Sequence, residues 1–384
     1  MPLAIVDLDA LDANVARLCE PARAHGKRVR VVTKSVRCPA LLAHIADVSG
    51  GVVQSAMIYS AQECPVLVEH GFDDLLLAYP TVQAADLACL VEANRRGTTV
   101  RVVVDCNAHV DALASAARTA SVRVPVLVDV DVAYKPTRSV HLGVRRSPVR
   151  TPADVVRLAR HVAARPELRF DGIMAYEAQI AGLADAGLAL AAFKRLSRRA
   201  VVESRAAIVA ALTTEGLPAS IVDGGGTGTL DANAREPALT EIAVGSGFLA
   251  SHLFDDYRGL GLTPAAFFAL PVARKPAADI VTCHGGGWIA SGAPGLDRLP
   301  RPVYPAGLSL LGMEGAGEVQ TPLKVGGGGS QKHRVTLDVG DPVFFRHAKA
   351  GELAEHVNEY LLVRGDKIVD RVHTYRGMGR CFLG

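Results

Sequence analysis

Eight short runs rich in β-branched residues alternate with longer helical segments, and this alternation restricts the fold more than any other feature of the chain. The runs are Val29–Thr33, Gly51–Gln54, Asp74–Leu77, Thr98–Val104, Pro125–Asp131, Leu168–Met174, Ser220–Asp223 and Glu241–Val244. Residues 81–97 and 153–166 are typical of the segments between them, because their apolar side chains recur at helical spacing. Strands that alternate with helices form parallel β/α units. The pattern predicts an α/β fold, a (β/α)8 barrel of the TIM type, in the first two thirds of the chain.

A doubly wound parallel sheet is the alternative fold for the same pattern. Such a sheet usually carries a glycine-rich dinucleotide-binding turn after its first strand. Here the first strand continues into "VVTKSVRCP", which places Lys34 where the glycines would stand. We therefore prefer the barrel.

From about Leu262 the pattern changes, because Pro and Gly become frequent and long helical segments give way to short strand-like runs at 333–339 and 366–375. This change predicts a smaller C-terminal domain made mainly of β-strands. We expect the barrel to span residues 9–255, and the β-rich domain to span 256–384 together with 1–8 as an added edge strand. The glycine-rich segment 324–333 resembles a flexible linker and has no part in the functional interpretation.

Charge and hydropathy exclude several classes of partner. The 384 residues include 42 Lys and Arg against 39 Asp and Glu, a net charge of +3 that gives no support for nucleic acid or an anionic membrane. Charged residues begin at Asp7, too early for a signal peptide, and no apolar run approaches the roughly 20 residues that cross a bilayer. We expect a cytoplasmic protein that acts on a small molecule.

Seven cysteines lie scattered along the chain, at positions 19, 38, 64, 89, 106, 283 and 381. No two of them form a CxxC pair. The spacing predicts reduced thiols rather than a disulfide framework or a zinc knuckle.

Lys34 directly follows the first predicted barrel strand. The carboxyl ends of the strands form the active face of such barrels. A desolvated amine at this end can condense with an aldehyde, whereas a lysine in the same place can also be an ordinary solvated surface residue.

Two glycine-rich turns follow the last two predicted strands. Backbone N–H groups in such turns, together with hydroxyl groups, suit a bound phosphate; the alternative is a tight turn that needs positive φ. The candidate phosphate-binding residues are Gly225, Gly226 and Thr227 in the first turn and Gly245, Ser246 and Gly247 in the second. Together with Lys34 they would hold opposite ends of pyridoxal 5′-phosphate.

These motifs resemble those of the fold-type III pyridoxal phosphate enzymes, the alanine racemase architecture. Within them the chain is most similar to the D-threonine aldolase and D-serine dehydratase branch and the related amino acid deaminase/aldolase group, in which the lysine precedes Cys-Pro, here Lys34, Cys38 and Pro39. The segment "GIMAYEAQIAG" is similar to the one that places a tyrosine beside the cofactor ring, here Tyr176. The resemblance implies a homodimer whose cofactor forms a Schiff base with Lys34.

The chain departs from the pattern of this branch at two positions. His141 stands where many relatives have an arginine against the cofactor phenolate, with Arg145 and Arg146 nearby. Near the C-terminus, His347 matches the first residue of a metal-binding pair, but Lys349 replaces the second, and an ammonium group cannot bind a metal.

Two interpretations of this C-terminal segment follow. Either no divalent metal binds, and Lys349 supplies positive charge to the substrate hydroxyl or carboxylate, or His347 recruits Glu352 or His356, which would share one face of a helix. The segment 348–360 is also compatible with a solvated amphipathic helix of no catalytic role.

His284 precedes three glycines and the only tryptophan, Trp288. It is a candidate general acid or base that reaches the cofactor of a neighbouring subunit, although a lone histidine can equally be structural or solvated. Glu314 and Glu318, in another glycine-rich loop, are further candidates for substrate or metal contact.

The resemblance implies a pyridoxal phosphate-dependent lyase that cleaves a D-configured β-hydroxy amino acid to glycine and an aldehyde. Dehydration to a keto acid and ammonia is the first alternative. Racemisation is the second; it needs a further base such as a tyrosine, for which Tyr304 and Tyr375 stand in no familiar context. A non-catalytic carrier of the cofactor is the third, and the roughly 120 residues beyond the barrel argue against it, because a closing domain serves mainly to exclude water.

Overall fold

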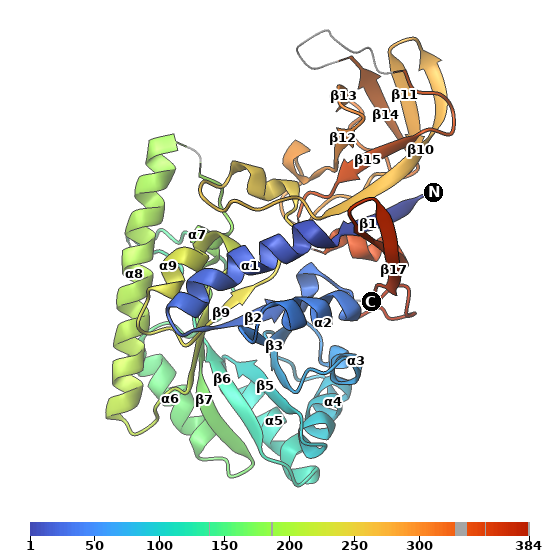
Figure 1. Ribbon diagram of the computed structural model, residues 1–384. Helices are drawn as coiled ribbons and strands as arrows, with labels where there is room; N and C mark the ends of the chain where they lie inside the picture. Colours follow the sequence, from blue (N-terminus) through green and yellow to red (C-terminus); the bar gives the residue numbers. More distant parts are fainter. Residues whose placement is uncertain (138, 186, 327–335, 350, 383–384) are drawn as a thin grey trace. The chain divides into compact units, whose positions relative to one another are not determined.

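The computed structural model describes the whole chain except residues 138, 186, 327–335, 350 and 383–384. In the described residues, eight parallel strands close a barrel and nine further strands form a separate sheet (Figure 1). The predicted fold class, a (β/α)8 barrel with a smaller β-rich domain, is confirmed.

Contacts between residues divide the chain into two compact units. The barrel unit contains Ala16–Lys34, Leu42–Gly245 and the last residues of the chain. The strand-rich unit contains Met1–Val15, Ser35–Leu41 and Ser246–Cys381. The domain boundaries expected from the sequence, 9–255 and 256–384 with 1–8, stay a prediction.

Eight strands form the barrel, each hydrogen-bonded to the next, and the last strand pairs with the first. They are β2 (Arg28–Val32), β3 (Val53–Ile58), β4 (Asp74–Leu77), β5 (Thr99–Val104), β6 (Val124–Asp129), β7 (Leu168–Met174), β8 (Ile221–Gly224) and β9 (Glu241–Val244). All eight runs predicted from the sequence overlap a barrel strand. β3 begins two residues later than expected, because Gly50 and Gly51 both have positive φ and turn the chain before it.

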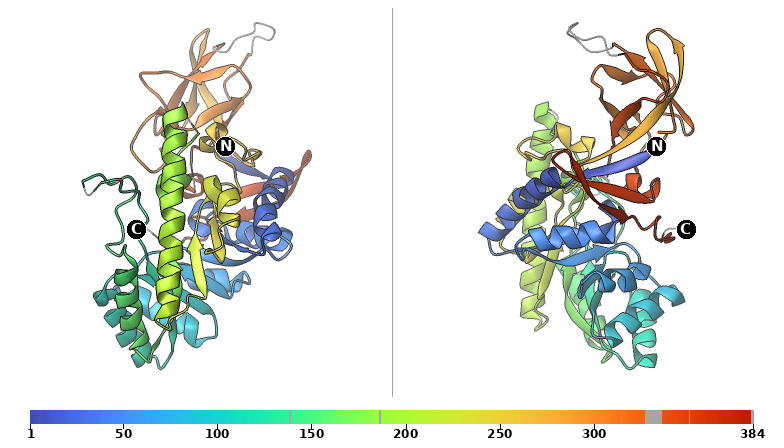
Figure 2. Two further views of the ribbon diagram at one scale, coloured as in Figure 1. Left: turned by 90° about the vertical axis from the view of Figure 1, so that its left-hand side faces the viewer. Right: turned by 45° about the vertical axis from the view of Figure 1, so that its right-hand side comes forward.

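One helix, α1 (Leu8–Ala24), precedes the first barrel strand, and others follow most of the barrel strands. The latter are α2 (Pro39–Val48), α3 (Cys64–Glu69), α4 (Ala84–Arg95), α5 (Asn107–Thr119), α6 (Pro152–Ala163), α7 (Ala178–Ala181), α8 (Gly187–Thr214) and α9 (Leu230–Ala234). The start of α6 shows how the sequence sets a helix boundary: Thr151 and Asp154 each accept a hydrogen bond from the other's backbone N–H, and Pro152 occupies the first helical position. The helix α6 packs against β7 and the long helix α8 (Figure 2). The buried side chains of α6 are all apolar.

One apolar side chain from each strand fills the middle of the barrel. These side chains are Val32, Met57, Leu76, Val103, Leu127, Met174, Ile221 and Ala243. Because side chains alternate between the two faces of a strand, residues two positions away point the same way. The layer therefore separates the interior near the amino ends of the strands from the mouth at their carboxyl ends.

A chain of buried ion pairs lies on the amino-terminal side of this layer. Arg30 contacts Glu241 at 2.6 Å and Asp74 at 2.8 Å, and Arg101 contacts Asp74 at 2.7 Å and Asp171 at 2.9 Å. Burial opposes the charge of Arg30, but its two carboxylate partners outweigh burial and raise its pKa. Each of the two arginines therefore has two carboxylate partners inside the barrel.

The strand-rich unit contains the nine other strands. They are β1 (Leu3–Asp7), β10 (Ala266–Ala277), β11 (Ile280–His284), β12 (Arg301–Tyr304), β13 (Leu308–Leu310), β14 (Gln320–Val325), β15 (Pro342–Arg346), β16 (Glu359–Arg364) and β17 (Lys367–His373). The order along the sheet is β13-β14-β11-β10-β1-β16-β17, and β15 pairs with both β10 and β12. The prediction of a strand in residues 1–8 is confirmed, but its edge position is wrong, because β1 pairs with β10 on one side and β16 on the other.

Two other expectations for this unit have different outcomes. The strand-like run 366–375 forms β17, whereas the run 333–339 lies partly outside the described residues and its described part is not a strand. The helix considered for 348–360 is wrong: Glu352–Glu355 is one 3-10 turn, and Glu359 already begins β16.

The glycine-rich segment 327–335 lies outside the described residues. No helix in the described part of the chain is long and apolar enough to span a bilayer.

Candidate active site

Lys34 lies at the carboxyl end of β2, in a 3-10 turn that spans Thr33–Ser35. Its Nζ donates a hydrogen bond to the hydroxyl of Tyr79, over 3.1 Å. Tyr79 follows β4, so two segments 45 residues apart meet because all barrel strands end at the same mouth. The lysine predicted from the sequence therefore has an aromatic neighbour that the sequence did not indicate.

Tyr176 lies between a guanidinium group and a glycine turn at the same mouth. The Arg146 guanidinium carbon is 5.8 Å from the centre of the Tyr176 ring. A side chain at Gly226 would lie 3.5 Å from the Tyr176 ring, an ordinary contact, and 3.1 Å from Ala181, a tight one, so the backbone of the turn runs close to the ring. Burial raises the pKa of Tyr176 to about 12, and the negative charge of Glu177 adds to this shift. The phenol is therefore neutral near physiological pH.

The glycine turn after β8 is held by the buried carboxylate of Glu177. One oxygen accepts hydrogen bonds from Thr229 Oγ1 and Asn233 Nδ2, each over 2.7 Å, and the other accepts the N–H of Gly225 over 3.1 Å. Gly225 has φ +94°, and a side chain there would lie 2.6 Å from the Asn233 amide. The conformation therefore requires glycine at position 225.

Arg205, fully buried on α8, compensates the charge of Glu177. Its guanidinium forms ion pairs with Glu177 and, at 2.8 Å, with Glu236. Burial opposes ionisation of Glu177, but Arg205 and the hydrogen bonds from Asn233 and Thr229 outweigh it and hold the pKa of this carboxyl below its usual value. Arg205 thus acts on the turn through Glu177.

This network changes the interpretation of the predicted phosphate-binding residues. The N–H of Gly225 is already donated to Glu177, and the N–H of Gly226 is donated to Thr229 Oγ1 over 3.2 Å. These two glycines shape the turn and allow close approach, while their N–H groups are engaged within the barrel. Thr227 begins the short 3-10 turn that follows.

The second predicted turn falls at the border between the two units. Gly245 ends the barrel unit, whereas Ser246 and Gly247 belong to the strand-rich unit. There, the Ser246 hydroxyl is 3.2 Å from the hydroxyl of Ser35, the residue after Lys34.

The structure places Arg146, and not His141, beside Tyr176. The His141 ring nitrogen Nε2 is 3.0 Å from the Val144 carbonyl oxygen, a local contact within the loop between β6 and α6. An arginine is therefore present near Tyr176 even though the sequence position expected for it holds a histidine.

Asp129, the last residue of β6, is a buried carboxyl group that the sequence did not single out. Burial raises its pKa to about 7, the negative charge of Asp105 adds to the shift, and Arg146 opposes it. A carboxyl group that gains and loses its proton near neutral pH is typical of active sites. The position directly at a strand end was the signal available in the sequence.

The sequence profile of the alanine racemase N-terminal domain matches residues 6–245, which include the whole barrel and Lys34. The chain belongs to this family. The predicted resemblance to the fold-type III enzymes is therefore confirmed, and membership implies dependence on pyridoxal 5′-phosphate.

Two sequence relatives and one solved structure show how far the similarity to this family extends. A 3-hydroxy-D-aspartate aldolase of Paracoccus denitrificans (strain Pd 1222) is 29% identical over 252 residues, which are 64% of this chain and 59% of the relative. A D-threo-3-hydroxyaspartate dehydratase of Delftia sp. (strain HT23) is 26% identical over 274 residues, 71% of this chain and 66% of the relative. The matches thus span less than two thirds of these relatives' lengths. The crystal structure of a D-threonine aldolase from Filomicrobium marinum has the same fold, with a TM-score of 0.84 at 20% identity over 98% of this chain and 96% of that one.

The barrel mouth suits the cofactor that the alanine racemase family implies. Lys34 offers an amine for the aldehyde, Tyr176 offers a flat ring, and the turn at Gly226 brings its backbone close to that ring. Arg146 adds a positive charge next to the same ring. These groups match an aldehyde, an aromatic ring and anionic substituents in one ligand.

Three further predicted site residues, His284, His347 and Lys349, lie in the strand-rich unit of this alanine racemase family member. Burial lowers the pKa of His347 to about 3, so its imidazole is neutral, and its Nδ1 has no hydrogen-bond partner among the described residues. Lys349 Nζ donates to the Ser291 carbonyl oxygen over 3.3 Å. His284 is exposed at the end of β11.

Glu352 and His356, which were considered as further ligands of a metal bound at His347, have other contacts. Glu352 accepts a hydrogen bond from the backbone N–H of Lys349 over 2.7 Å. His356 stacks on Trp288, with ring centres 4.7 Å apart and planes 3° from parallel. In the part of the chain that is described, His347 does not belong to a group of metal-ligand side chains.

The stacked pair predicts a pH-dependent fluorescence signal. Burial, and then the positive charge of Arg376, lowers the pKa of His356 below 6.5. We expect Trp288 fluorescence to fall as the pH is lowered, with a midpoint below pH 6.5. The reason is that a protonated imidazole in contact with an indole quenches the emission of the indole. The unfolded chain binds this proton more readily, so the contribution of the neutral pair to stability is lost as pH falls below 6.5. His356→Gln should abolish the transition, exposed His25→Gln should leave it intact, and a transition that survives in His356→Gln would contradict the assignment.

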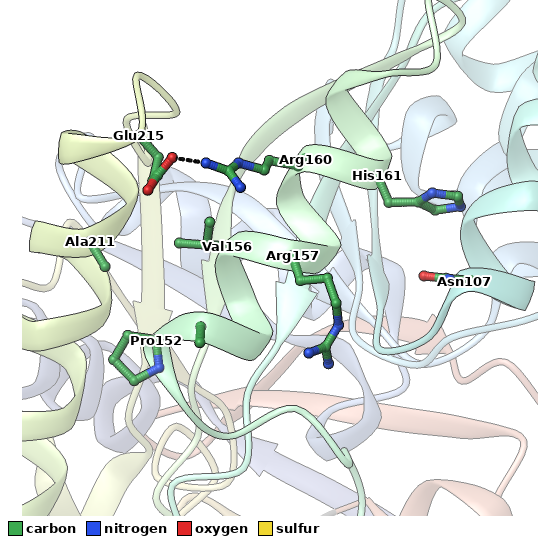
Figure 3. A pocket seen from close by; sticks show the side chains of 9 residues that line it. Asn107, Pro152, Val156, Arg157, Arg160, His161, Ala211 and Glu215 are labelled. Carbon is green, nitrogen blue, oxygen red and sulfur yellow. Dashed lines mark hydrogen bonds and ion pairs between the residues drawn. The ribbon is translucent and has the colours of Figure 1, made fainter.

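A shallow cavity on the outside of the barrel is separate from these groups (Figure 3). It has a volume of about 640 Å³ and is lined by residues of α5, α6 and α8 and their ends. Arg160 and Glu215 form an ion pair across it, while Arg157 points away from that pair. Its lining contains neither Lys34 nor Tyr176.

Proposed function

We propose that this protein is a pyridoxal phosphate-dependent lyase that cleaves a D-configured β-hydroxy amino acid into glycine, or another small amino acid, and an aldehyde. The observation that carries the proposal is the placement of Lys34 at the carboxyl end of β2 in a barrel of the alanine racemase family. The similarity to a 3-hydroxy-D-aspartate aldolase supports this substrate class.

Lys34 would carry the cofactor through its amine and release it to the amino group of the substrate. Tyr79, which accepts a hydrogen bond from Lys34 Nζ, would orient this amine toward the barrel mouth. Tyr176 would form the wall against the cofactor ring, and Arg146 or His141 would face the phenolate. The phosphate would lie against the turns that contain Gly225, Gly226 and Thr227 and Gly245, Ser246 and Gly247.

When bound, pyridoxal phosphate withdraws electrons from the substrate α-carbon, so that one bond at this carbon can break. Lys349 would supply positive charge to the substrate hydroxyl or carboxylate, and His284 would exchange a proton at the site of a neighbouring subunit. These roles make a homodimer the proposed assembly. A cytoplasmic location and the absence of nucleic-acid and membrane partners are parts of the same proposal, supported by the net charge of +3. A divalent metal at His347 is the less favoured alternative.

Dehydration is the second candidate function, because one relative is a D-threo-3-hydroxyaspartate dehydratase. The two reactions start from the same substrate class and differ in the bond that breaks. Cleavage gives glycine and an aldehyde, whereas dehydration gives a keto acid and ammonia.

Product analysis tests this proposal directly. We expect holoenzyme incubated with D-threonine or D-threo-3-hydroxyaspartate to release glycine and the matching aldehyde, and L-isomers to give at most about a hundredth of that rate, as a positioned stereocentre requires. A keto acid with equimolar ammonia would support the dehydratase instead. Interconversion of D- and L-amino acids without cleavage would show a racemase, and a yellow protein inactive on every substrate would indicate a carrier. Chelation by EDTA, with metal content measured in parallel, tests the role of His347.

A further inference from the structure

Three side chains with the chemistry of metal ligands converge just after β5. Asp105 follows the strand, Cys106 directly precedes α5, and His109 lies in the first turn of that helix. Their ligand atoms, a carboxylate oxygen, the thiol sulfur and an imidazole nitrogen, all lie within 4.8 Å of one another. Among the residues that the structure describes, this is the one group of three or more His, Cys, Asp or Glu side chains whose ligand atoms lie this close together.

The contacts of these side chains leave their ligand atoms available. His109 Nδ1 lies 2.9 Å from Asp105 Oδ1, yet this nitrogen is buried without a hydrogen bond to any described residue. Cys106 has the extended backbone of a residue that caps a helix, but its side chain makes no capping hydrogen bond. The two atoms of the His–Asp pair are close without the alignment of a hydrogen bond, as expected when both are directed at a shared position.

The ligand set selects a class of ion. Thiolate and imidazole are preferred by zinc and similar transition metals, whereas calcium and magnesium prefer oxygen. Cys106 stands directly before the amino end of α5, so its thiol lies at the same strand end as the carboxylate of Asp105. Three protein ligands leave a fourth tetrahedral position for water or another ligand.

An access route reaches the group from one side. A cavity of about 270 Å³ is lined by polar residues that include Asp105, Cys106 and Asn107, and by Asp154, which is paired with Arg157 in the same lining. A hydrated ion therefore has a path to the thiol and the carboxylate. The spacing Asp-Cys-x-x-His lacks the CxxC pair by which zinc sites are read from sequence, so the chain pattern did not reveal it.

We propose that Asp105, Cys106 and His109 bind a divalent transition-metal ion of the zinc class at the carboxyl end of β5. The site is distinct from His347, and it does not depend on the reaction proposed above.

The test measures metal content, not activity. Holoenzyme is stripped with a chelator, incubated with micromolar Zn²⁺, passed over a desalting column and analysed by mass spectrometry for metal. We expect about one equivalent of Zn²⁺ per chain, and at least about a tenfold weaker affinity in Cys106→Ser and His109→Asn, because each loses a ligand. Loading wild-type protein with Co²⁺ should produce a thiolate-to-cobalt absorption band in the difference spectrum.

Matched controls come from the same barrel. His161 lies on α6 (Figure 3). Its Nε2 is 3.0 Å from Oδ1 of Asp111 on α5, a similar His–Asp contact without a cysteine. His161→Asn and Cys89→Ser should therefore keep full metal binding. Wild-type protein that retains no zinc, a cobalt spectrum without a thiolate band, or undiminished affinity in folded Cys106→Ser or His109→Asn would each overturn the assignment.

Discussion

Replacement of Lys34 by alanine is expected to lower the rate of substrate cleavage by about 10³-fold or more, because it removes the group that holds the cofactor covalently. Lys34→Arg should be equally inactive, since a guanidinium keeps the charge but cannot exchange places with the substrate amine. Borohydride should fix the cofactor to wild-type protein at a peptide that contains Lys34, and to neither variant. Exposed Lys367→Ala is the matched control and should retain wild-type activity.

Two outcomes would contradict this assignment. Fixation at a different lysine would move the site away from the mouth at β2. Full activity in Lys34→Ala would show that the hydrogen bond between Lys34 and Tyr79 is structural only. Tyr79→Phe separates these cases further: it keeps the ring and removes the hydroxyl, so we expect borohydride fixation to persist with slower turnover.

The position of Lys34 was predictable because a single local rule locates it. A lysine directly after the first strand of a parallel barrel lies at the mouth wherever the barrel closes. Tyr79, Asp129 and Arg146 follow no comparable motif, since their importance arises only when β4, β6 and the loop before α6 meet at the same end. The sequence therefore predicted the place of Lys34 at the mouth, but gave no comparable local rule for the groups that other strands bring to the same end.

The errors in the fold have physical causes of the same kind. β1 was expected at an edge because its partners cannot be read locally: Ile5 pairs with Phe267 and Leu361, more than 260 residues away. The segment 348–360 has apolar residues at spacings that also fit a helix. Pairing of β16 with β1 and β17 fixes its end as a strand and leaves one 3-10 turn before it.

Replacement of Arg205 by leucine is expected to lower the free energy of unfolding by about 3–5 kcal/mol, because it leaves two buried carboxylates without their cation. The side chains of Arg205, Glu177 and Glu236 are 1%, 2% and 3% exposed. Arg199→Leu on the same helix is the matched control. Its partner Glu203 is one turn away and both are exposed, so we expect a change within about 0.5 kcal/mol.

The pH dependence distinguishes loss of charge compensation from loss of packing. Without Arg205, burial should raise the carboxyl pKa of Glu177 above that of the unfolded chain. It should also raise further the pKa of Glu236, which burial already raises in the wild type, so more stability is lost as pH rises. The deficit relative to wild type should therefore be larger at about pH 8 than at about pH 5.5 in urea denaturation, and Glu177→Gln added to Arg205→Leu should recover part of it. A deficit equal at both pH values would mean that Arg205 acts through packing alone. Glu177 also accepts the N–H of Gly225 and is paired with Arg205. The folded Arg205→Leu protein should therefore bind pyridoxal phosphate more weakly than the Arg199→Leu protein does. This result would connect a buried charge on α8 to the shape of the turn at the barrel mouth.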